Sequence, residues 1–139
     1  MLLLDTQVWV WTVEGNARRV GTQARREISR AEAMGDMRIS PVTLFEIVAL
    51  HTSGRLQLSR PPEQWLRESL ELPGVRLAEL SGAVAIDAGD IPRTSLSDPL
   101  DRLLVATARQ LDATFLTADA AILAYAARAG RVRVHNAAR

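Results

Sequence analysis

Acidic and hydroxyl side chains directly follow two short apolar runs, and their chemistry suits metal or phosphoryl work. Asp5 and Thr6 come immediately after Leu2–Leu4, while Thr117 and Asp119 close a later run. Carboxylates that gather in one place repel one another, and they cannot all stay ionised unless a cation lies among them. Because their oxygens are hard ligands, Mg²⁺ or Mn²⁺ is the cation that we expect.

Further acids occupy comparable places in the middle of the chain. Ser40 ends a third apolar run, and Glu46 lies a turn and a half into the helix predicted after it; Asp98 and Asp101 open another predicted helix. The Glu46 helix is apolar on almost every side, so we expect it to be largely buried. An ionised glutamate there is costly unless it is paired with an arginine such as Arg102 or bound to a metal.

Most of these acids also have a purely structural interpretation. Asp5, Asp98 and Asp119 each precede a predicted helix, where an aspartate caps the first backbone N–H groups. Asp101 falls in a first helical turn, where a negative charge suits the helix dipole. Glu46 has no such role, and it is therefore the acid for which a functional role is hardest to dismiss.

Short apolar runs alternate with helical patterns along the whole chain, and these elements must position the acids. Strands are predicted at 2–4, 37–40, 75–80, 114–117 and 132–135, and helices at 6–13, 17–34, 41–53, 61–72, 83–88, 99–111 and 119–128. Strands separated by helices predict an α/β fold with a mostly parallel sheet covered on both faces. Residues 1–139 suit a single domain, and ligands of such sheets gather at the carboxyl ends of the strands, where the acids stand.

The composition removes several other classes of protein. The 139 residues carry a net charge of +1, and all 17 basic side chains are arginine. The absence of lysine excludes P-loop and Schiff-base chemistry, as well as phosphoacceptor modules of the receiver type. The absence of cysteine excludes disulfides and cysteine-held metals. No targeting or membrane segment is visible, so we expect a cytoplasmic protein.

Four segments together resemble the PIN-domain ribonucleases, and among them the VapC-type toxins: LLLDTQVWVW, ISPVTLFEIVAL, SDPLDRLLVATARQL and TFLTADAAILAY. The resemblance implies a PIN-like three-layer α/β fold. It implies an acidic quartet that holds one or two Mg²⁺ or Mn²⁺ ions: Asp5, Glu46, Asp101 and Asp119. It also implies that neighbouring side chains assist this quartet: Asp98, Thr117, Thr6 and Ser40. Arginines such as Arg102 are expected to hold the RNA backbone.

The same resemblance implies a function and partners. The expected reaction is metal-assisted endonucleolytic hydrolysis of RNA by the toxin of a toxin–antitoxin pair. A small antitoxin and a second copy of the chain are the expected partners, with the tryptophan-bearing helices at 6–13 and 61–72 expected to form those surfaces. The alternative is a catalytically silent PIN-like domain that binds protein or RNA.

Overall fold

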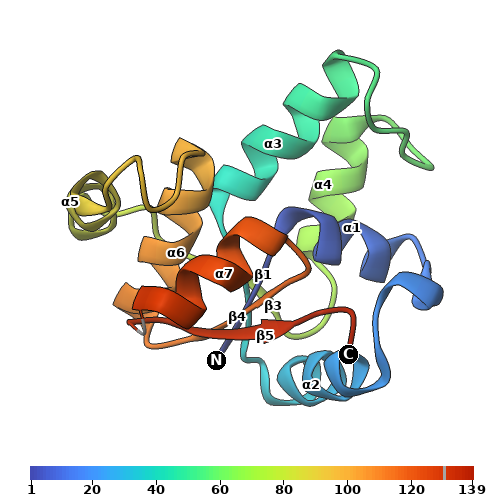
Figure 1. The fold of residues 1–139 in the computed structure, drawn as a ribbon. Helices are drawn as coiled ribbons and strands as arrows, with labels where there is room; N and C mark the ends of the chain where they lie inside the picture. The colour runs from blue at the N-terminus through green and yellow to red at the C-terminus, as the bar shows by residue number, and fades with distance from the viewer. Residues whose placement is uncertain (130) are drawn as a thin grey trace.

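The fold is built around one parallel sheet, shown in Figure 1. The computed structural model describes residues 1–129 and 131–139. Its strands are β1 (Leu2–Leu4), β2 (Met37–Ile39), β3 (Val75–Leu77), β4 (Thr114–Thr117) and β5 (Arg133–Asn136). They lie in the order β3-β2-β1-β4-β5, and every pair is parallel. The chain leaves β1 first toward β2 and later returns to its other side with β4, which creates a topological switch point between β1 and β4.

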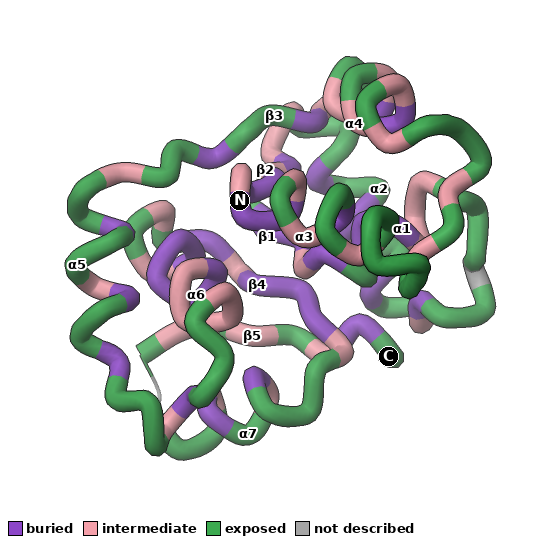
Figure 2. The backbone as a smooth tube through the Cα atoms, turned by 90° about the horizontal axis from the view of Figure 1, so that it is seen from above, coloured by how far each residue is buried: buried purple, intermediate pink, exposed green. Residues whose placement is uncertain are grey.

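Helices connect the strands and cover both faces of the sheet, and Figure 2 shows the buried β1 and β4 between them. They are α1 (Thr6–Val13), the 3-10 turn η1 (Ala17–Arg19), α2 (Thr22–Met34), α3 (Pro41–Thr52), α4 (Pro62–Leu70), α5 (Gly82–Asp90), α6 (Pro99–Leu111) and α7 (Ala120–Ala129). The predicted α/β fold with a parallel sheet is confirmed. In the part of the chain that the structure describes, no helix is long and apolar enough to cross a membrane.

One predicted boundary is wrong, because the helix expected from residue 17 is interrupted before Thr22. Gly21 takes an extended conformation at the start of α2 and packs against the backbone of Arg139. A Cβ atom at Gly21 would lie 2.0 Å from the carbonyl carbon of Arg139. Since the N–H of Gln23 also donates to the Arg139 carbonyl at 2.8 Å, the end of the chain fixes where α2 begins.

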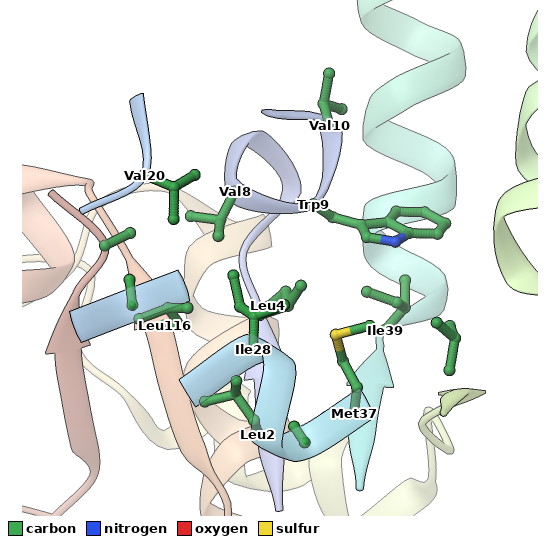
Figure 3. Packing of buried hydrophobic residues seen from close by; sticks show 14 of the residues in the cluster. Leu2, Leu4, Val8, Trp9, Val10, Val20, Ile28, Met37, Ile39 and Leu116 are labelled. Carbon is green, nitrogen blue, oxygen red and sulfur yellow. The ribbon is translucent and has the colours of Figure 1, made fainter. Parts of the chain in front are cut away.

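The core is divided between the two faces of the sheet. Leu2 and Leu4 point toward α1, α2 and α4, as Figure 3 shows for the buried side chains of that face. Leu3 points the other way, toward α6 and α7. Trp9 of α1 and Trp65 of α4 are both fully buried and meet edge to face at 5.1 Å between ring centroids. These two tryptophans therefore belong to the core of the chain, and the partner surface expected on these two helices does not include them.

Helix α3 departs from its predicted burial. It packs against α1, α4 and α6 at the carboxyl edge of the sheet and projects beyond it in Figure 1. Phe45 is 61% exposed and Val48 is 42% exposed, whereas Val42, Thr43 and Ile47 are buried. The helix is apolar on almost every side, but only one side faces the core. The other side presents apolar side chains to the surface, so the predicted burial holds for half of the helix.

Candidate active site

Asp5 stands at the switch point, where β1 ends and α1 begins. Its Oδ2 accepts a hydrogen bond of 2.5 Å from the hydroxyl of Thr117, the last residue of β4. Its Oδ1 accepts the N–H of Thr6 at 2.8 Å. Burial raises the pKa of Asp5, and these two hydrogen bonds oppose that rise because they favour the charged form. Both oxygens of Asp5 are therefore oriented by neighbouring main-chain and side-chain donors.

Glu46 of α3 is tied to the same place through Thr6. The Thr6 hydroxyl donates to Glu46 Oε1 at 2.6 Å, and it lies 3.0 Å from the hydroxyl of Thr43. A threonine hydroxyl has one proton, so Thr43 must donate to Thr6 while Thr6 donates to Glu46. Burial raises the pKa of Glu46, and Asp5 adds to this rise. Thr6 and Thr43 are both buried, so this chain of hydroxyls is shielded from water.

Two exposed acids lie at the rim of the site, and both cap helices. Asp98 accepts the N–H of Leu100 at 2.8 Å at the start of α6. Asp119 accepts the N–H of Ile122 at 3.0 Å before α7, and its own N–H donates to the Thr117 hydroxyl at 3.0 Å. Each uses Oδ1 as a cap and leaves Oδ2 without a donor among the described residues. The structure therefore shows the capping role that the sequence suggested, with one carboxylate oxygen still unused.

Asp101 lies one turn into α6 and accepts no hydrogen bond from the residues that the structure describes. Its side chain is half-buried. Burial is the main cause that raises its pKa to about 7, and repulsion from Asp98, Asp119, Asp5 and Glu46 adds to the rise. Acids that follow β1, lie in α3, begin α6 and precede α7 thus share one electrostatic field, although they are up to 114 residues apart in the sequence.

The remaining sequence-predicted residues have different surroundings. Ser40 accepts the N–H of Val42 at 3.0 Å and caps α3, and it makes no bond to the acids. The expected pairing of Arg102 with Glu46 is not formed, and the buried Nε of Arg102 has no hydrogen-bond partner among the described residues. Thr43 was missed by sequence reasoning. The sequence could have indicated it, because Thr43 lies three residues before Glu46 and such residues share one side of a helix.

The acids do not form a closed metal cage. Within residues 1–129 and 131–139, no three histidine or acidic side chains are placed close enough to hold an ion together as they stand. The side chains that share the field carry oxygen donors only, from carboxylates and hydroxyls, which is the donor set of a hard divalent cation. The arrangement is therefore an open cluster of oxygen ligands.

Comparison with known proteins identifies the family. The model of the PIN domain matches residues 2–128, a span that includes every acid of the cluster. The chain belongs to the PIN-domain family. This PIN domain is 31% identical over 107 residues to Ribonuclease VapC22 of Mycobacterium tuberculosis, which covers 77% of the chain and 78% of that relative.

Solved structures share the fold of this PIN domain over almost its whole length. One is the structure of VapBC2 from Rickettsia felis bound to a DNA fragment from their promoter, with a TM-score of 0.65, 16% identity and 97% of each chain covered. Another is FitAcB from Neisseria gonorrhoeae, with a TM-score of 0.61, 25% identity, and 98% of this chain and 97% of that chain covered. The predicted PIN-like fold is thus confirmed.

Proposed function

We propose that this PIN domain is a metal-dependent endoribonuclease that uses Asp5, Glu46, Asp101 and Asp119 to hydrolyse RNA phosphodiester bonds. The observation that carries the proposal is the shared field of these acids at the switch point of a parallel sheet. Family membership and the 31% sequence identity to Ribonuclease VapC22 make the chain a ribonuclease of the VapC type. The residue assignments and the metal requirement are the proposed parts.

A divalent cation fits the chemistry of the cluster. Asp101 has no donor among the described residues to offset its charge, and burial together with repulsion from its neighbours raises its pKa to about 7. One or two Mg²⁺ or Mn²⁺ ions would be held directly by Asp5 and Asp101, with Glu46 and Asp119 completing the site. When bound, such an ion polarises the phosphoryl group, activates a water molecule and stabilises the leaving oxygen.

The chain itself supplies orientation. Thr117 and Thr6 fix both oxygens of Asp5. The hydroxyl chain from Thr43 through Thr6 holds Glu46 Oε1, which leaves Oε2 to orient the attacking water. Such fixed polar groups lower the cost of reorganisation during the reaction. We assign Arg102 a contact with the RNA backbone. It is the residue after Asp101 in α6, and its side chain forms no ion pair with the acids.

We also propose that the chain is the toxin of a pair neutralised by a small antitoxin, and that it forms a homodimer. The support is its likeness to the chains of the VapBC2 complex and to Ribonuclease VapC22. The exposed Phe45 and Val48 of α3 offer an apolar surface suited to such a partner. Of the two tryptophans of α1, Trp11 is the one that remains accessible to a partner, and it lines a small cavity between α1 and α2.

The test compares cleavage of single-stranded RNA by the wild-type protein and by Asp101→Asn, with Mg²⁺, with Mn²⁺ and with a chelator. Cleavage should need the metal and should be lost in the variant. Asp90→Asn, which removes an exposed acid at the end of α5, is the matched control and should cleave normally. Wild-type protein that binds RNA but cleaves none with either metal would favour the silent binding module instead.

A further inference from the structure

Strand β5 forms an open edge of the sheet. Its one neighbour is β4, and Figure 1 shows α2 on one side of it and α7 on the other. A cavity of about 690 Å³ lies along this edge against α2, and a second of about 390 Å³ lies against α7. Both are lined by Leu123, Val134 and His135, so the two hollows adjoin along the strand. We call this continuous hollow the β5 groove.

The α2 side of the β5 groove is positively charged. Arg26, Arg30 and Arg139 line it, all three are exposed, and none of their guanidinium groups forms an ion pair or hydrogen bond with a described residue. The single acid that lines this cavity, Glu27, is already engaged by His135, with 2.5 Å between Oε1 and Nδ1. Three arginines face one carboxylate in this cavity, so the α2 side of the groove remains net positive.

The α7 side of the β5 groove is apolar. Leu123, Ala126, Ala127 and Val134 line it, and the arginine there, Arg133, is paired with Asp112 at 2.9 Å. α2 and α7 cover opposite faces of the sheet, as the two halves of the core show. An added strand would point successive side chains alternately toward these two faces.

We propose that the free edge of β5 binds an extended segment of a partner protein by strand addition, with acidic side chains toward α2 and apolar side chains toward α7. The main chain of such a segment pairs with the outer edge of β5 as far as Asn136, whose carbonyl already accepts the N–H of Arg139 at 3.2 Å. The two walls of the β5 groove select its side chains. Charge complementarity with Arg26, Arg30 and Arg139 makes the selected segment acidic. This inference uses no property of the acidic cluster, so it can fail or hold independently of the nuclease assignment.

Other occupants suit the groove less well. A single-stranded nucleic acid stacks its bases on aromatic side chains, and among the residues that line the two cavities the one aromatic ring is that of His135, which is already bonded to Glu27. A second copy pairing through its own β5 would bring a second set of the same arginines into the groove, where the like charges repel.

The test uses a synthetic fluorescent peptide of about eight residues, close to the length of a common strand, in which glutamate alternates with valine. Binding is measured by anisotropy on the wild-type protein without RNA or metal. The variants are Arg26→Glu and Arg30→Glu. Arg76→Glu is the matched control, because it makes the same charge change at an exposed arginine on β3, the opposite edge of the sheet. A peptide with alternate backbone amides methylated keeps the side chains but cannot pair.

The proposal expects the peptide to bind wild-type protein and Arg76→Glu equally, and about tenfold more weakly in each groove variant, as for loss of one good charge contact. The methylated peptide should not bind, and peptide binding should slow hydrogen exchange at Val134 and Asn136. Equal weakening by Arg76→Glu, equal binding of the methylated peptide, or unchanged exchange in β5 would each overturn it. Loss of oligouridylate binding in the groove variants, with no peptide binding, would assign the groove to RNA.

Discussion

The acids of the cluster fall into an inner and an outer pair that are held by different means. Asp5 and Glu46, the inner pair, are fixed by hydroxyls of buried threonines, and burial raises the pKa of both. Asp98 and Asp119, the outer pair, are exposed and held by the first N–H groups of helices. The inner acids therefore depend on tertiary packing, whereas the outer acids are positioned by local helix geometry.

Asp101 lies between the two pairs and should show the largest effect of a single substitution. Asp101→Asn should lower RNA cleavage by at least about a hundredfold, the lower end of the range for a group acting at the reacting atoms. Without metal, the same substitution should raise the melting temperature, because it removes a carboxyl whose charged form is disfavoured by burial and by the neighbouring acids. Initial rates and circular-dichroism melting measure the two effects. Normal cleavage by this variant would remove Asp101 from the site.

The hydroxyl chain of the inner pair should rank second. Thr6→Val keeps the shape of the side chain but leaves Glu46 without its donor and Thr43 without its acceptor. We expect a loss of cleavage of about 10-fold to 100-fold, as is usual for residues that orient ligands. Thr6→Ser should restore most of the rate, since it restores the hydroxyl. Equal rates for the valine and serine variants would show that orientation of Glu46 does not matter.

The pH dependence of stability should show how burial and the neighbouring acids disfavour the charged form of Asp101. An unfolded aspartate ionises near its usual pKa of 3.8, whereas Asp101 in the folded chain ionises at about 7. Between these values the unfolded state has lost a proton that the folded state retains, so rising pH favours unfolding. Stability of metal-stripped protein should therefore fall from about pH 4 to about pH 7 and then level off.

Solvent around the half-buried Asp101 reduces the size of this effect. Asp101→Asn should make the fall with pH shallower. Millimolar Mg²⁺ should raise the melting temperature most at pH 8, where the cluster carries its full charge, because the ion binds the folded state. A melting temperature that is the same with Mg²⁺ and with a chelator at pH 8 would contradict a converged site.

Substitutions in the outer pair should give the smallest effects. They should distinguish the contribution of the helix cap to stability from the contribution of the carboxylate charge to cleavage. Asp119→Asn keeps an oxygen that accepts the Ile122 N–H, so stability should stay near wild type while cleavage falls. Asp119→Ala should lose the cap as well, at a cost of about 1 kcal/mol. Urea unfolding of the two variants measures this difference. Identical unfolding curves would mean that the cap contributes nothing to stability.

Much of the fold was predictable, because apolar runs with acids at their ends mark the strands directly. Leu2–Leu4 with Asp5, and Thr114–Thr117 with Asp119, lie as the pattern indicated. The placement of β4 beside β1 was not predictable, because strand order depends on pairing between segments more than a hundred residues apart. The exposure of Phe45 and the close packing of Gly21 on Arg139 depend on the same long-range arrangement.

The pairing of the first strand with the fourth also has a consequence for how the protein is made. During synthesis β1 leaves the ribosome early, yet the Asp5 N–H bonds to the carbonyl of Leu116, and Thr117 orients its carboxylate. Such distant contacts form late and slow folding. Asp5 and Glu46 are not joined by the other acids until β4 and the start of α7 have been made. A growing chain therefore carries no assembled acidic site until most of it has been translated.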